Sequence, residues 1–143
     1  MRVAIGILAF ASLLLPQDLD RTEDDIPAVT TFVAPPYPQA ARNARIMGKT
    51  LTSIGINRDG VVTNAETIHA HPVFQTEVWV ALKQWRFKPS RREHTLQVTC
   101  IFEFTGCEDA PALETYVSAE LPTVVHIKTA LPCVVVHKEG TLK

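Results

Sequence analysis

Apolar and polar positions alternate clearly between residues 95 and 104, which predicts a strand with one buried face. The positions predicted to share this face are Leu96, Val98, Cys100, Phe102 and Phe104. Gln97, Thr99 and Glu103 fall on the other face, where Ile101 is the apolar exception. Because Cys100 lies among the apolar positions, we expect it to be a packed free thiol.

Residues alternate in character every second position between Lys49 and Asn57 as well, which predicts another strand. Its even positions are β-branched, and such residues favour strands; they are Thr50, Thr52, Ile54 and Ile56. The sequence from Asn57 to Gly60 is typical of a tight turn, since Asp-Gly tolerates positive φ. We therefore predict a hairpin whose returning strand runs from Val61 to Ile68.

Two segments have helical patterns instead. Residues 38–47 begin with a proline, contain good helix formers and end before Gly48, which predicts a short helix. A second helix is predicted to start at Pro72 and to end before Pro89. Its apolar residues recur at helical spacing and are Phe74, Val78, Ala81, Leu82 and Trp85.

The predicted order is helix, strand, strand, helix, strand. This order indicates an α+β fold with two helices packed on a three-stranded antiparallel sheet. Two short apolar runs follow, Thr123–Lys128 and Cys133–His137, and each predicts a short strand. We therefore divide the body of the chain into a compact domain at 37–104 and a C-terminal β extension at 105–143.

The N-terminal residues have a different character. Arg2 precedes a run of 13 residues from Val3 to Leu15 that is almost entirely apolar, which is typical of an export signal rather than a membrane-spanning helix. We expect residues 1–16 to be a signal peptide or a short membrane-tethering segment. Residues 17–36 hold five acids, one base and several prolines, which predicts an extended acidic linker. The body of the chain is therefore expected in the periplasm.

Composition narrows the classes of function. The chain has 143 residues, 46% of them hydrophobic and 20% charged, with a formal net charge of −1. That balance disfavours a nucleic-acid-binding protein, which needs a basic surplus. Residues 83–92 do hold five bases, which indicate a solvated helix end or a contact with peptidoglycan or an acidic receptor segment.

The three cysteines form no pair at metal-ligand spacing, so the sequence predicts no zinc site. Export to an oxidising compartment would permit one disulfide, and Cys107 with Cys133 would join the extension to the domain. Three free thiols are the alternative.

Candidate chemistry is sparse. His69 and His71 alternate and could begin a metal site, but no third ligand lies at a supporting spacing, so we favour a surface loop. Serines lie in no nucleophile elbow, and no glycine-rich phosphate loop is present. Trp85, Arg86 and Phe87 indicate either a partner-binding patch or, as we favour, apolar anchors of the second helix. The sequence predicts no enzyme, cofactor or metal.

Three blocks of sequence together resemble the C-terminal domain family of TonB, an energy transducer. They are Tyr37-Pro38-x-x-Ala41-Arg42-x-Ala44-x-Ile46-x-Gly48, then Asp59-Gly60-x-Val62, then His71-Pro72 with Gln84-Trp85-Arg86-Phe87-Lys88-Pro89. Their order and spacing agree over roughly residues 37–104.

The resemblance implies a non-enzymatic periplasmic domain that contacts outer-membrane receptors and couples inner-membrane energy to import. In that family an extended receptor peptide adds to the exposed edge of the sheet, where it satisfies unpaired backbone groups. By resemblance, the pairing strand lies near Thr95–Phe104. Its partner-binding residues are expected to be Gln97, Val98, Thr99, Ile101 and Glu103.

The chain also departs from a full transducer. Its acidic linker of about 20 residues spans at most roughly 70 Å, and its N-terminal apolar segment is short. The extension at 105–143 could itself pair with the sheet edge. The alternative is therefore a self-contained or dimerising envelope protein whose sheet edge is covered by its own C-terminal extension.

Overall fold

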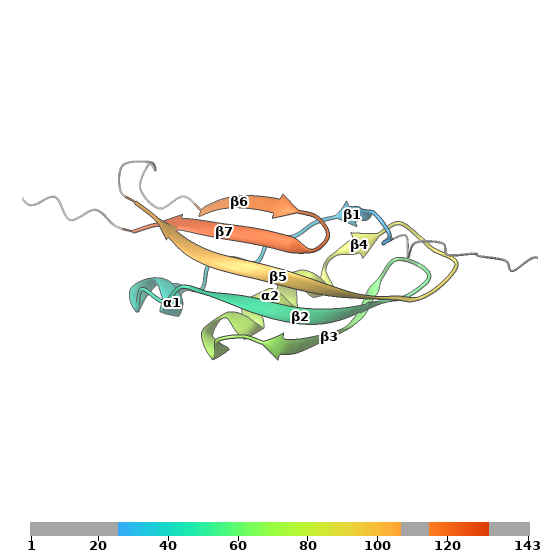
Figure 1. The fold of residues 1–143 in the computed structure, drawn as a ribbon, viewed down its shortest axis with the longest axis horizontal. Helices are drawn as coiled ribbons and strands as arrows, with labels where there is room; N and C mark the ends of the chain where they lie inside the picture. The colour runs from blue at the N-terminus through green and yellow to red at the C-terminus, as the bar shows by residue number, and fades with distance from the viewer. Residues whose placement is uncertain (1–25, 107–114, 132–143) are drawn as a thin grey trace, which may run out of the picture.

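The structure is a computed structural model that describes residues 26–106 and 115–131. A five-stranded sheet has helices on one face (Figure 1), and its strand order is β3-β2-β5-β7-β6. The strands are β3 (Val62–His69), β2 (Gly48–Ile56), β5 (His94–Thr105), β7 (Val124–Ala130) and β6 (Thr115–Glu120). The helices are α1 (Gln39–Asn43) and α2 (Pro72–Lys83). A separate two-stranded sheet pairs β1 (Val29–Thr31) with β4 (Arg86–Phe87).

The predicted α+β class is confirmed, and so are its three antiparallel strands, β3, β2 and β5. The predicted three-stranded sheet is nevertheless too small. Strand β7 pairs with β5 in parallel, from Thr99 with Val124 to Thr105 with Ala130, and β6 pairs with β7 on the outside. The run predicted at Thr123–Lys128 is thus an inner strand, whereas the run at Cys133–His137 lies outside the described residues.

Burial follows the two alternations that the sequence contains. The even positions of β2 from Thr50 to Ile56, and those of β5 from Leu96 to Phe102, are buried, while the odd positions of both strands are more exposed. Strand β7 continues this face, because Val125 and Ile127 are fully buried. One apolar layer therefore runs under β2, β5 and β7.

Tyr37 connects the helical layer to this sheet. Its ring lies 5.9 Å from that of Phe74 in α2 and 5.5 Å from that of Phe102 in β5, both edge-on, measured between ring centroids. Its hydroxyl donates a hydrogen bond of 2.6 Å to the carbonyl of Ile46. Aromatic pairs of this geometry add to the energy of burial, so the Tyr37-Pro38 block of the sequence has a structural role.

The residues just before Tyr37 also belong to the folded body. Val29, Phe32 and Val33, which the sequence analysis placed in the linker, pack against the core. The indole N–H of Trp85 donates a 2.8 Å hydrogen bond to the carbonyl of Val33, and Trp85 is fully buried. This contact holds the N-terminal segment across the end of α2.

The hairpin turn after β2 needs its glycine. Gly60 has a φ of 80°, and a Cβ there would collide with the carbonyl of Phe87. That close approach allows the Phe87 N–H to donate a 2.8 Å hydrogen bond to the Gly60 carbonyl. The turn therefore fixes the position of β4, and with it the loop that leads into β5.

Both helices are shorter than predicted. Helix α1 ends at Asn43, and the left-handed residue after it is Arg45, with a φ of 54°, rather than Gly48, which already begins β2. Helix α2 ends at Lys83, because Arg86 and Phe87 form strand β4 with β1 instead of extending the helix to Pro89.

Because Ile127 is fully buried, we expect Ile127→Ala to lower the free energy of unfolding by about 3 kcal/mol, the loss typical of a large-to-small core substitution. The matched control is Val117→Ala in β6, since Val117 is 42% exposed; it should change stability by less than about 0.5 kcal/mol. Urea denaturation measures both. Equal effects of the two substitutions would contradict the inner position of β7.

Candidate functional site

Strand β5 is paired with β2 over most of its length on one side and with β7 over its second half on the other. Strand β2 pairs with it from His94 to Phe102. On the opposite side, pairing with β7 begins only at Thr99. In the described part of the chain, no strand pairs with residues 94–98 on that side. We call these five residues the open half of β5.

The backbone groups of this half face outward. The Thr99 N–H points toward β7, because it donates a 2.8 Å hydrogen bond to the carbonyl of Thr123. In a strand, the backbone N–H and C=O groups of every second residue point to the same side. Hence the N–H and C=O of Thr95 and Gln97 point away from β2, and both side chains are exposed. These are the unpaired groups that another extended segment can satisfy.

The five residues expected to bind a partner divide between the two halves. Gln97 lies in the open half, as does Val98, although the Val98 side chain is fully buried in the core. Thr99, Ile101 and Glu103 lie opposite Val124, His126 and Lys128 of β7. The last of these pairs also forms an exposed ion pair, with 3.7 Å between Lys128 Nζ and Glu103 Oε2.

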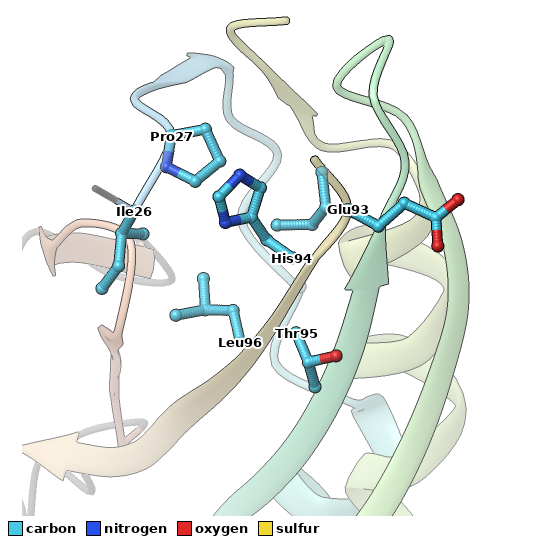
Figure 2. A pocket seen from close by; sticks show the side chains of 7 residues that line it. Ile26, Pro27, Glu93, His94, Thr95 and Leu96 are labelled. Carbon is cyan, nitrogen blue, oxygen red and sulfur yellow. The ribbon is translucent and has the colours of Figure 1, made fainter. Parts of the chain in front are cut away.

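A pocket of about 240 Å³ lies beside the open half of β5. Its walls are Ile26 and Pro27 from the N-terminal segment, Ile56 from the end of β2, and residues 93–96. Figure 2 shows the ring of His94 beside Pro27, with Ile26 and Leu96 below them, while the Glu93 carboxylate points away. The pocket therefore combines polar and apolar walls next to unpaired backbone groups.

His94 is held in place by Ser90, whose Oγ lies 2.8 Å from His94 Nε2. Ser90 in turn donates its backbone N–H to the carbonyl of Arg58, at 2.9 Å. The loop that precedes β5 is thus tied to the hairpin turn. Sequence reasoning missed Ile26, Pro27 and His94 as parts of one surface, because they are distant in sequence and share no motif.

The structure gives the aromatic block a structural role and places His71 at the start of α2. Trp85 and Phe87 are buried in the core, and Arg86 donates hydrogen bonds to the carbonyls of Lys83 and Trp85. His71 accepts a hydrogen bond from the Val73 N–H at the start of α2. Within residues 26–106 and 115–131, no three His, Cys, Asp or Glu side chains group as metal ligands.

Cys100 is a buried free thiol, as the alternation predicted. Burial raises its pKa to about 11. The predicted partners Cys107 and Cys133 lie outside the described residues, and so does the predicted export segment at 1–16. Among the helices that the structure describes, none has the length and apolar character needed to cross a bilayer.

The described residues define a small α+β domain in which helices cover one face of a sheet and part of one strand keeps an unpaired edge. Comparison with known proteins agrees with this class. The sequence model of the family described as Gram-negative bacterial TonB protein C-terminal matches residues 33–105, just over half of the chain. The chain therefore belongs to the TonB C-terminal domain family.

Curated relatives support the same family. Protein TonB of Escherichia coli K12 is 31% identical over 74 residues, which cover 50% of this chain and 31% of the relative. Protein TonB of Klebsiella pneumoniae is 30% identical over 84 residues, which cover 57% of this chain and 35% of the relative. The chain thus spans about a third of the length of these relatives. The comparisons indicate no catalytic family.

The raised pKa of Cys100 predicts a loss of stability at high pH. The folded state holds the proton up to about pH 11, whereas the unfolded thiol releases it near 9.0. Stability is therefore complete below pH 9 and falls as the pH rises toward 11, by roughly 1 kcal/mol between pH 8 and pH 10. Urea denaturation at the two pH values measures this, and Cys100→Ala should remove that part of the loss. An unchanged slope in Cys100→Ala would contradict the assignment.

Proposed function

We propose that this chain is a non-enzymatic periplasmic protein-binding domain that acts in TonB-dependent transport across the outer membrane. In this proposal it recognises an extended peptide of an outer-membrane receptor by pairing it with the edge of the sheet. The observation that carries the proposal is the open half of β5, where the backbone groups of Thr95 and Gln97 face outward without a partner strand among the described residues. Membership of the family supports the link to transport.

Pairing begins, in this proposal, at Gln97. The other expected contacts at Thr99, Ile101 and Glu103 require that β7 leave β5. Because Val125 and Ile127 of β7 are fully buried, that displacement would expose two large apolar side chains, at a cost of about 2 kcal/mol or more for each. The peptide therefore adds to the open half first, with the Val98 side chain remaining in the core beneath it.

A second candidate is favoured by the pairing of β7 with β5. A chain that covers most of its own strand edge is suited to be a self-contained envelope protein. In the part of the chain that the structure describes, the outer edge of the sheet is then β6, whose six residues are all exposed. A second copy pairing there would give the dimerising form of this alternative.

The remaining parts of the proposal concern segments that the structure does not describe. Residues 1–16 act as an export signal or as a short inner-membrane tether, which places the domain in the periplasm. A disulfide between Cys107 and Cys133 would join the segments that flank the β6–β7 hairpin. The proposal includes no cofactor and no metal.

The test uses a proline scan of the two free edges. Gln97→Pro removes an N–H that points away from β2, so the hydrogen bonds to β2 remain while the open half loses a donor. The probe is the peptide acetyl-Ser-Thr-Val-Thr-Val-Ser-amide, titrated while backbone amide shifts are followed. We expect shifts at residues 95–98 in the native chain and about ten-fold weaker binding in Gln97→Pro.

Two controls make the result specific. Gln97→Ala keeps the backbone N–H and should bind as the native chain does. Val117→Pro alters the edge of β6 and should leave binding unchanged. If the peptide instead shifts residues 115–120 and binding fails only in Val117→Pro, the edge that pairs is β6 and the proposal for β5 is wrong. No shift at either edge at millimolar peptide would also contradict it.

A further inference from the structure

The sheet has another edge at β3, which lies on the far side of β2 from β5. Within residues 26–106 and 115–131, no strand pairs with β3 on its outer side. The Ala65 carbonyl points to that side, because it accepts a hydrogen bond from a side chain of α2. Since backbone groups alternate in direction along a strand, those of Thr67 point the same way. The outer side of β3 therefore carries backbone groups of the kind that an added strand can pair with.

Trp79 of α2 covers this edge in its middle. Its indole N–H donates a hydrogen bond of 3.2 Å to the Ala65 carbonyl, so that one outward acceptor is already satisfied. The ammonium group of Lys83, one helical turn further along α2, lies over the indole ring at 4.1 Å from its centroid. The indole is therefore held by two contacts, one to β3 and one to its own helix, although Trp79 is 40% exposed.

Irregular pairing confines the regular part of β3 to residues 64–67. The register with β2 shifts at both ends of this stretch, which leaves Thr63 and Ile68 without an opposite residue. Bulges of this kind bend a strand and disrupt further pairing. An added strand could therefore pair regularly only across Ala65 and its neighbours, where Trp79 lies.

Strand β6, the outermost strand on the other side of the described sheet, is different. It pairs with β7 in continuous register from Thr115 to Glu120, and all six of its residues are exposed. The two outer strands of the described sheet are thus unequal. Strand β6 is regular and exposed, whereas β3 is bulged at both ends and covered by a side chain in its middle.

We propose that Trp79 determines which edge of the sheet accepts an added strand, because its indole closes β3. The hydrogen-bond partner of an outward carbonyl occupies the place of the next strand, and at Ala65 that partner is the indole N–H. Pairing with another chain is thereby directed to the side of β5 and β6. This inference concerns the edge opposite the open half of β5, so it goes beyond the proposed function and does not depend on it.

Trp79→Ala should open β3 to pairing. The probe is acetyl-Ser-Thr-Val-Thr-Val-Ser-amide, titrated into the full chain while backbone amide shifts are followed. Residues 64–67 should not shift in the native chain, whereas in Trp79→Ala they should, with binding at β3 at least about ten-fold tighter. Trp79→Phe removes the donor but keeps a ring over the edge, so it should give a smaller gain. It decides the question if Trp79→Ala does not fold.

Two further variants test whether the new shifts come from strand pairing. Val80→Ala changes a neighbouring residue of α2 that is 46% exposed, and it should leave β3 closed. Thr67→Pro, added to Trp79→Ala, removes an outward N–H of β3 and should abolish the new shifts. Shifts that persist in this double variant would arise from something other than pairing and would overturn the inference.

The remaining outcomes separate this inference from the proposed function. If residues 64–67 already shift in the native chain, or stay unshifted at millimolar peptide in the folded Trp79 variants, Trp79 does not close the edge and this inference is wrong. Shifts at residues 95–98 are recorded in the same titrations. Their absence from every variant contradicts the proposed function alone, and their presence beside an unresponsive β3 in the Trp79 variants contradicts this inference alone.

Discussion

The parallel pairing of β7 with β5 is the constraint on which the surface of this domain depends. It makes β5 an inner strand, paired on both sides, over residues 99–102, and the outermost strand on that side of the described sheet is then β6. Two fully buried residues, Val125 and Ile127, hold β7 in place. Over the residues that the structure describes, positions 94–98 of β5 keep outward backbone groups without a partner strand.

The order of β7 and β6 has a physical reason. Strand β6 follows β5 in the sequence and is antiparallel to β7. Since β7 is parallel to β5, β6 has the direction needed to pair with β5 as the next strand of a meander. Strand β7 places Val125 and Ile127 in the core at alternate positions, whereas the corresponding residues of β6, Val117 and Ala119, are smaller in total and exposed. The more apolar strand gains more by lying inside, since burial is worth roughly 25 cal/mol per Å² of apolar surface.

Sequence reasoning could predict the elements whose periodicity is strong. The alternation in β2 and β5 and the helical spacing in α2 each gave the correct type of element and the correct buried face, including Cys100. It could not predict β6, since all six of its residues are exposed and no apolar period marks it. Nor could it predict β1 and β4, which are short and depend on the approach of Gly60 to Phe87.

The candidate site was predicted in part for the same reason. Gln97 follows from the alternation and the family resemblance, and it lies in the open half of β5. Ile26, Pro27 and Arg58 could not be assigned to the same surface, because tertiary contacts bring them there: the Lys88 N–H bonds to the Ala28 carbonyl, and the Ser90 N–H to the Arg58 carbonyl. Those two hydrogen bonds are invisible in a single sequence.

The boundary of the family match falls between β5 and the β6–β7 hairpin. The match runs from residue 33 to residue 105 and ends where β5 ends, so the β6–β7 hairpin lies outside it. The family match therefore includes β5 but not the hairpin that pairs with most of it. An added hairpin that buries two large apolar residues is a stable part of the sheet rather than a loose cover. Within the described part of the chain, the hairpin leaves residues 94–98 of β5 unpaired on that side, next to a pocket that shares Ile26 and Pro27 with a second hollow lined by Lys88.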